Sequence, residues 1–322
     1  MAKKLPKIVT EIRNNPPTEV NYAYQKNISY SQMSIFRGCP HRWKLQYKDK
    51  IKKFTSSIHT VFGTAIHETI QEYLNVMYDI SGAAADQIDI EKNFQVNFID
   101  EYQKQYKSNN NEHFSSAEEM REFFEDGIGI LNWFKKKRSK YFSKRGWHLV
   151  GCEIPIVIAP NKRYNNVLYM GYLDIVMYHE LTDTFKIIDI KTSTRGWKDQ
   201  DKKNEDKQFQ LLLYKQFFSE QYNIPLDKID IEFFIVKRKV LDWDDEKLMS
   251  PHQAYRVQTF TPPSGKIKLN RAKESINYFI TTCFTTGGEI KEILYPKNIS
   301  KWNCSYCPFK EDKENCGEGI IY

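Results

Sequence analysis

The stretch KIIDIKTSTRGW, residues 186–197, places an aspartate and a lysine among β-branched residues. Isoleucines at this density predict a strand inside a sheet, where an unpaired charge is costly. Side chains two residues apart point to the same side of a strand, so Asp189 and Lys191 emerge together. The pair is either a structural salt bridge or part of an active site, and this stretch leaves both alternatives open.

A second carboxylate interrupts the preceding apolar stretch, GYLDIVMY, at Asp174. If the two strands form a hairpin through HELTDT (179–184), Asp174 approaches the edge where Asp189 and Lys191 emerge. Carboxylates hold Mg²⁺ or Mn²⁺, and such an ion lowers the pKa of a bound water. The lysine would position this water or neutralise charge on a phosphate. The cluster therefore suits a divalent-metal phosphodiesterase.

The hydrophobic pattern predicts an α/β fold with a central mixed β-sheet flanked by helices. A helix with a bend at Pro40 is expected from about Ser29 or Ser31, a second from about Val61, and a last long one over 268–284. Strands are expected at 148–159, 167–179, 184–193 and 229–240, with a helix at 207–222.

We expect residues 1–27 to form an extended arm and residues 28–322 to form a single domain. Within that domain we expect a helical insertion (64–145), a catalytic core (147–260) and a cysteine-rich tail (300–322).

The overall charge is modestly basic. The 322 residues include 48 Lys and Arg against 41 Asp and Glu, so any affinity for nucleic acid must come from local clusters. No signal peptide or apolar run of membrane-spanning length is evident, which predicts a cytoplasmic protein, in the host cytoplasm if it is viral. The sequence also lacks a phosphate-binding P-loop, so a helicase or recombination partner would be a separate protein.

Four short motifs occur in a fixed order: FGTAIHETI (62–70), Gly171-x-x-Asp174, Asp189-x-Lys191 and Gln210-x-x-x-Tyr214. In this order the chain resembles the PD-(D/E)XK nuclease superfamily, in its RecB-like branch, from roughly Ser31 to Cys316. The resemblance implies a restriction-endonuclease-like core and metal-dependent cleavage of DNA.

The resemblance also implies a role for each motif residue. His67, Asp174, Asp189 and the backbone carbonyl of Ile190 would bind Mg²⁺ or Mn²⁺, and Lys191 would serve the attacking water. Gln210 and Tyr214 would hold the lysine or contact the DNA strand.

The ordinary alternatives to these roles are a half-buried histidine at position 67 and a polar rim of an amphipathic helix at positions 210 and 214. Glu153 is either a supporting carboxylate or a surface residue at a strand end.

Cys304-x-x-Cys307 has a metal-binding spacing, and Cys316 and Cys39 can complete a set of four thiolates. One cysteine before the nuclease motifs and three after them resemble the iron–sulfur subset of RecB-like nucleases, which includes AddB, exonuclease V and CRISPR-associated exonucleases. That resemblance implies a [4Fe–4S] cluster. The gap before Cys316 is longer than is usual there, and Zn²⁺ is the alternative. Cys152 and Cys283 are expected to be buried free thiols.

The stretch WFKKKRSKYFSKR (133–145) combines cations with aromatic residues. Cations that follow phosphates and rings that stack on bases are what a single-strand channel needs, whereas the alternative is a solvated helix face. The expected DNA contacts are Lys135, Lys136, Lys137 and Arg138 here, and Arg195, Trp197 and Lys198 beyond the charged strand.

These observations predict a metal-dependent DNA exonuclease that acts on free ends in recombination, repair or replication. The resemblance further implies a preference for single strands and for the 5′ to 3′ direction. The alternative is a non-catalytic DNA-end-binding or adaptor subunit of a recombination or CRISPR adaptation complex.

Overall fold

The computed structural model describes residues 5–239 and 256–316. The chain divides into two compact units, each built from three segments. Unit 1 comprises Met1–Pro16, Ser56–Ile154 and Tyr172–Pro263, and unit 2 comprises Pro17–Thr55, Pro155–Gly171 and Ser264–Tyr322. The single domain that we expected over 28–322 stays a prediction. Val240 of the last predicted strand and residues 317–322 of the predicted tail lie outside the described residues.

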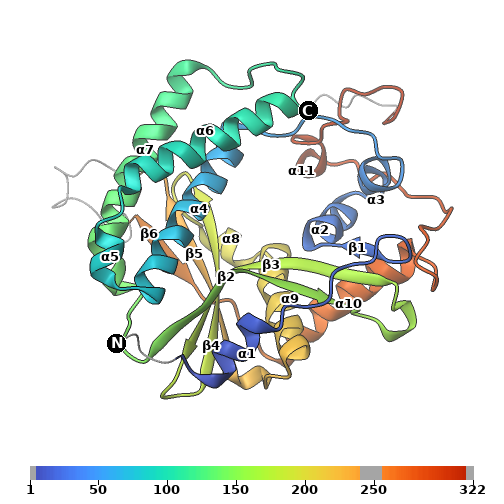
Figure 1. Ribbon diagram of the computed structural model, residues 1–322. Coiled ribbons are helices and arrows are strands. Elements are labelled where there is room, and N and C mark those ends of the chain that lie inside the picture. The colour runs from blue at the N-terminus through green and yellow to red at the C-terminus, as the bar shows by residue number, and fades with distance from the viewer. Residues whose placement is uncertain (1–4, 240–255, 317–322) are drawn as a thin grey trace. The chain divides into compact units, whose positions relative to one another are not determined.

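The described strands form a mixed six-stranded sheet in the order β1-β3-β4-β5-β6, with β2 paired to β3 (Figure 1). Their bounds are Lys26–Ile28 (β1), Trp147–Ile158 (β2), Val167–His179 (β3), Thr184–Ser193 (β4), Ile229–Lys237 (β5) and Val257–Phe260 (β6). β3 and β4 form the expected antiparallel hairpin, and β5 lies parallel to β4. This arrangement confirms the predicted α/β class.

One face of the sheet in unit 1 is covered by helices α4 (Ile58–Asp79), α6 (Ile90–Ser108) and α7 (Ala117–Lys137), which pack on one another in Figure 1. Ile188 and Ile190 of β4 belong to the same buried cluster as the apolar residues of these helices. The expected helix containing His67 is therefore confirmed, and it begins at Ile58. The short α5 (Gly82–Asp86) follows α4.

The opposite face of β4 and β5 contacts α9 (Glu205–Tyr222), which follows the short α8 (Asp199–Lys203). Asn204 begins α9, because its side chain accepts hydrogen bonds from the amides of Asp206 and Lys207. Residues of β4 alternate between the two faces, so Asp189 and Lys191 share the face opposite Ile188 and Ile190.

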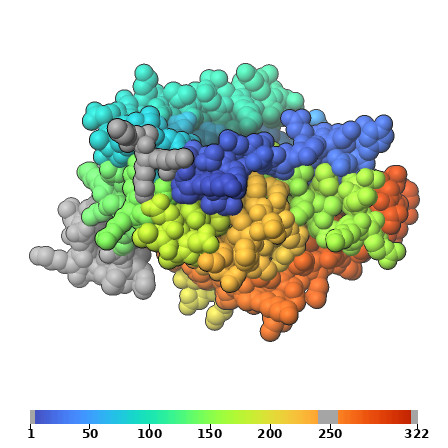
Figure 2. Space-filling model, turned by 60° about the horizontal axis from the view of Figure 1, so that its bottom comes forward, coloured from blue at the N-terminus to red at the C-terminus, as the bar shows by residue number. Residues whose placement is uncertain are grey.

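The expected extended arm at residues 1–27 is wrong at Lys7–Asn14, whereas residues 15–25 have no regular helix or strand. Lys7–Asn14 form helix α1, whose Val9 and Ile12 are buried. The guanidinium of Arg13 donates to the carbonyls of Leu149 and Val150 and so ties the helix to β2. In Figure 2 the dark blue α1 lies at the surface next to yellow-green residues of the hairpin region. Two apolar residues three apart were too weak a signal to predict this helix.

Unit 2 contains α2 (Tyr30–Gly38), α3 (Pro40–Trp43), α10 (Lys266–Cys283) and α11 (Lys301–Cys304). Ser29, one of the two expected caps, begins α2, and the helix that was expected to bend at Pro40 is interrupted at Cys39, whose backbone is extended. The residue before a proline disfavours helical dihedral angles, which explains the break. The buried Trp43 packs against Phe36, Phe279 and Phe284 and forms the centre of this unit.

Short helical turns complete the description: η1 (Lys44–Lys48), η2 (Arg138–Lys140), η3 (Lys162–Tyr164) and η4 (Leu226–Lys228). None of the described helices is both long and apolar enough to span a membrane.

Candidate active site

The hairpin brings the two predicted aspartates together in unit 1. The antiparallel register pairs Ile175 with Ile188, so one step further Asp174 stands opposite Asp189. There the carboxylate Oδ2 of Asp174 accepts a hydrogen bond of 2.7 Å from the backbone amide of Ile190. At this point the Asp174 side chain accepts the hydrogen bond of a β4 backbone amide, and this bond holds the Asp174 carboxylate against the strand that carries Asp189.

Asp189 is almost fully buried, with 1% of its side chain exposed, whereas 33% of the Lys191 side chain is exposed. The ammonium Nζ lies 2.8 Å from Oδ2 of Asp189. Neither carboxylate oxygen of Asp189 accepts a hydrogen bond of good geometry from the described residues. A buried carboxylate without hydrogen bonds is unusual and has unused capacity to bind a cation.

His67 approaches from α4. Its Nδ1 lies 3.5 Å from Oδ2 of Asp174. One turn earlier, a Cβ on Gly63 would lie 3.1 Å from the hydroxyl of Thr192, which is tighter than an ordinary contact. The absence of a side chain at Gly63 therefore allows α4 to pass close to β4 and positions the imidazole.

Burial controls the ionisation of these groups. It raises the pKa of Asp174 and of Asp189 to about 6, against the opposing effect of the Lys191 ammonium. It lowers the pKa of His67 to about 4, and Lys191 adds to this effect. Burial acts to lower the pKa of Lys191 too, but the two aspartates outweigh it and raise that pKa overall. At neutral pH the site therefore holds a neutral imidazole, two carboxylates and an ammonium.

These donors have the chemistry that a hard divalent cation prefers, since carboxylate oxygens predominate and the imidazole is neutral. Within residues 5–239 and 256–316, however, no three ligating side chains lie close enough to hold an ion as they stand. The Lys191 ammonium contacts the Asp189 carboxylate, which is one of the groups that would have to bind the cation. The residue types fit Mg²⁺ or Mn²⁺, and binding would require the ammonium to give up that contact.

The protein family of this chain follows from its match to known families. The family model of the PD-(D/E)XK nuclease superfamily matches residues 27–311. The chain belongs to this superfamily. Membership indicates metal-dependent cleavage of nucleic acids, for which these nucleases commonly use Mg²⁺ or Mn²⁺. None of the curated proteins compared with the chain matches it.

Gln210 and Tyr214 of this PD-(D/E)XK nuclease lie one turn apart on α9, and the amide Nε2 of Gln210 lies 3.2 Å from the Tyr214 hydroxyl. Tyr214 is buried, and burial raises its pKa, with smaller contributions from Asp189 and Asp174. The pair therefore faces the catalytic strand. Its role in holding Lys191 or contacting DNA stays a prediction.

Sequence reasoning missed Gln71, which supports the site from α4. Its amide Nε2 donates to Glu153 Oε1 at 2.6 Å and to the backbone carbonyl of Asp174 at 3.0 Å. Glu153 has a positive φ of 53°, a strained conformation for a residue inside a strand. The spacing of four residues between His67 and Gln71 was the available signal, because such residues share one helix face.

The loop after β4 is held by Gln258, whose side chain bonds to both the amide and the carbonyl of Trp197. The Trp197 ring packs against Phe233, with 4.8 Å between ring centroids, and Lys207 lies over it. Arg195 and Lys198 are exposed. The two cations are thus accessible to the nuclease's substrate, while the tryptophan is partly used in packing.

The basic stretch 133–145 differs from the expectation. Trp133, Phe134 and Phe142 are buried in the core of unit 1, so the predicted stacking role is wrong for these rings. Lys135 donates to the carbonyl of Ile88, and Arg138 pairs with Asp86. Lys136 and Lys137 are exposed.

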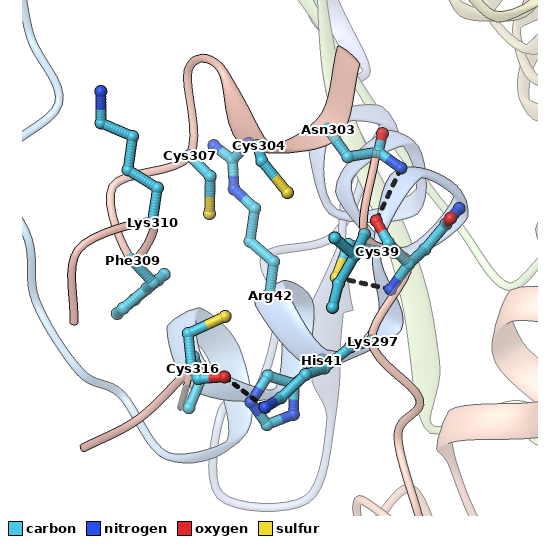
Figure 3. Close-up of a pocket in the computed structure, with 13 residues that line it drawn as sticks. Cys39, His41, Arg42, Lys297, Asn303, Cys304, Cys307, Phe309, Lys310 and Cys316 are labelled. Atoms are coloured by element: carbon cyan, nitrogen blue, oxygen red, sulfur yellow. Dashed lines mark hydrogen bonds between the residues drawn. The ribbon is translucent and has the colours of Figure 1, made fainter. Parts of the chain in front are cut away.

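Unit 2 brings the four predicted cysteine ligands to one cavity, which Figure 3 shows. Cys39, Cys304, Cys307 and Cys316 line it together with His41 and Arg42. Burial raises the pKa of the Cys307 and Cys316 thiols, and the neighbouring thiols add to this effect. Among the described residues, these thiols are not spaced to hold a single metal ion. Of the other two, Cys283 is a buried free thiol as predicted, and Cys152 is only partly buried.

Proposed function

We propose that this nuclease is a metal-dependent DNA exonuclease of the RecB-like branch. It hydrolyses phosphodiester bonds at DNA ends, prefers single strands and degrades them from 5′ to 3′, in cytoplasmic recombination, repair or replication. The observation that carries the proposal is the cluster of Asp174, the buried Asp189 and Lys191, with His67 beside it. Because the sequence contains no P-loop, any strand separation by ATP hydrolysis comes from a separate helicase.

Each residue has a defined task in this proposal. Asp174, Asp189, His67 and the Ile190 carbonyl would hold a divalent cation, which would lower the pKa of a water and stabilise charge on the phosphate. The Lys191 ammonium, which the aspartates keep protonated, would orient the attacking water. Gln71 fixes the backbone of Asp174. Gln210 and Tyr214 limit where the ammonium of Lys191 can move.

The test is hydrolysis of end-labelled DNA with Mg²⁺ or Mn²⁺, using separate 5′ and 3′ labels on single strands, duplexes and flaps. Lys191→Ala is expected to abolish product formation. Lys186→Ala is the matched control, because Lys186 lies on the same strand and pairs with Glu232 at a similar distance of 2.8 Å. Equal inactivity of wild type and Lys191→Ala on every substrate would favour the non-catalytic DNA-end-binding subunit instead.

We also propose that Cys39, Cys304, Cys307 and Cys316 bind a [4Fe–4S] cluster. Their place around one cavity supports this proposal. Anaerobically purified protein should absorb visible light, and Cys304→Ser should lose this absorption while Cys283→Ser retains it. A colourless protein with one bound Zn²⁺ would refute the cluster and favour the zinc alternative.

The exposed cations Arg195, Lys198, Lys136 and Lys137 are proposed to contact DNA phosphates, together with Lys135 and Arg138 once their internal contacts open. Trp197 is proposed to touch the substrate beside them. Phosphate contacts of this kind position the strand without reading its sequence.

A further inference from the structure

The two units differ strongly in charge. Unit 2 contains 19 Lys and Arg residues against 9 Asp and Glu, which gives a formal charge of +10. Unit 1 contains 29 against 32, which gives −3. The excess positive charge of the chain therefore resides entirely in unit 2, and a polyanion is the partner that such a surface attracts.

Unit 2 also carries the exposed aromatic rings. Among the described residues, the large aromatic side chains that are more than half exposed all belong to this unit: Tyr22, Tyr24, Tyr278, Trp302 and Tyr306. Trp302 is 85% exposed and Tyr306 is 91% exposed. Exposure of so much apolar surface is unfavourable for the isolated protein and indicates a binding surface.

Trp302 and Tyr306 line a groove within unit 2. They lie four residues apart in the turn that continues from α11, where the Ser305 amide donates to the Lys301 carbonyl. The groove is also lined by Ser34 and Gly38, which are four apart on α2, and by Arg42. The small side chains of Ser34 and Gly38 leave room in the groove for a planar group.

Gly38 has a further effect on this groove. A Cβ at this position would lie 3.3 Å from Oδ1 of Asn303, the residue that follows Trp302. The glycine therefore allows the turn that carries the two rings to lie against α2. The side chain of Asn303 is itself fixed, since its amide donates to the carbonyl of Asn298 at 3.0 Å.

We propose that this groove is a stacking platform for single-stranded nucleic acid, in which bases lie on Trp302 and Tyr306 while phosphates meet the cations of unit 2. The choice of nucleic acid rests on the proposed function. Stacking on aromatic rings accepts every base, so the platform binds single strands without sequence preference. A duplex hides the faces of its bases and gains only the electrostatic part of the binding.

The test compares two labelled oligonucleotides of about 20 nucleotides, poly(dT) and an abasic strand with the same phosphates, by fluorescence anisotropy. All proteins carry Lys191→Ala and are free of divalent metal, so that cleavage cannot intervene. Trp302→Ala and Tyr306→Ala are each expected to weaken poly(dT) binding by about tenfold. They should leave the affinity for the abasic strand unchanged within about twofold, and Trp302→Phe should restore part of the loss.

Tyr24→Ala is the matched control, because Tyr24 is a 74% exposed ring of the same unit that does not line the groove. It should bind both strands like the parent protein. An equal loss for the two strands, unchanged binding of poly(dT) by the ring variants, or a parent protein without preference for poly(dT) would each overturn the platform. Thermal unfolding of each variant separates loss of binding from loss of folding.

This design also separates the platform from the proposed function. If the rings give a preference for poly(dT) but the wild-type protein never cleaves DNA, the proposed exonuclease activity is refuted and the stacking platform is supported. If the wild-type protein cleaves DNA but shows no such preference, the stacking platform is refuted and the exonuclease activity is supported.

Discussion

The two compact units present the same chemical groups in opposite ways. Unit 1 buries the Asp189 carboxylate and covers most of Asp174, and it buries the aromatic rings Trp133 and Phe134. Unit 2 exposes its rings Trp302 and Tyr306 and carries a large excess of cations. Burial changes pKa values and creates reactivity, whereas exposure allows contact with a partner. The difference supports a proposed division in which unit 1 carries the chemistry and unit 2 stacks the bases, while cations of both units meet the phosphates.

The largest expected effect concerns the rate of cleavage. Lys191→Ala should lower kcat by about 10³-fold or more, because it removes the group that orients the attacking water. Its affinity for poly(dT) should remain that of wild type. The double variant Trp302→Ala/Tyr306→Ala should instead have a raised KM and a nearly unchanged kcat. Single-turnover rates and binding isotherms measure both quantities, and a large kcat loss in the double variant would contradict the division between the units.

The next effect concerns stability. Phe134→Ala should lower the free energy of unfolding by about 3–5 kcal/mol, since the ring is buried among Tyr73, Phe142 and Phe234. Trp302→Ala should change it by no more than about 0.5 kcal/mol, because the ring is exposed. Urea unfolding followed by circular dichroism provides the comparison. Similar losses in the two variants would show that Trp302 is part of a packed core.

Metal binding should depend on pH near the raised pKa values of the aspartates. Asp174 and Asp189 must lose their protons to bind a cation, and each does so with a pKa of about 6 in the metal-free protein. His67, with a pKa of about 4, stays neutral over this range. The affinity for Mn²⁺ should therefore fall by up to about 100-fold from pH 7 to pH 5.

Calorimetric titration with Mn²⁺ measures this dependence. Asp189→Asn should bind more weakly at pH 7 and lose only about tenfold between the two pH values, since one titrating carboxylate remains. A wild-type affinity that is constant between pH 5 and pH 7 would show that the aspartates do not bind the ion.

The smallest effect concerns the exposed cations of unit 1. The logarithm of the association constant for single-stranded DNA falls linearly with the logarithm of the salt concentration. In the variant Lys136→Gln/Lys137→Gln this slope should be shallower by about 1.4, the value for two lost phosphate contacts on a single strand. Its preference for poly(dT) over the abasic strand should not change, because no ring is altered. Binding titrations between low and moderate salt give the slope, and an unchanged slope would identify these lysines as a solvated helix face.

Sequence reasoning predicted which residues of the candidate site lie together where local geometry determined this. A two-strand hairpin with a short turn fixes which residues face one another, so Asp174 and Asp189 could be paired from their positions alone. Helical spacing placed His67 only on a helix, and its place at the site was implied by the resemblance to the nuclease superfamily. Gln71 was missed because its partner Glu153 depends on a positive φ within β2, which the residue types do not reveal.

The aromatic residues show the limit of such reasoning most clearly. Trp133 and Phe134 beside a run of lysines have the composition of a strand-binding helix, but the same spacing also serves a helix that packs against a sheet. Only the tertiary fold decides which side of α7 is covered. The interruption at Cys39 was predictable in principle, because Pro40 follows it.

The interleaving of the two units has a consequence for synthesis of the chain. Unit 1 possesses all its strands once β6 has been made, at Phe260, whereas unit 2 still lacks α10 and three of its four clustered cysteines. Domains generally fold as units while the ribosome extends the chain. Residues 17–55 must therefore wait for their later partners in α10 and the tail, while the residues of the candidate site can already assemble. A chain whose synthesis stops near residue 263 would possess the proposed catalytic residues without the proposed stacking surface of unit 2.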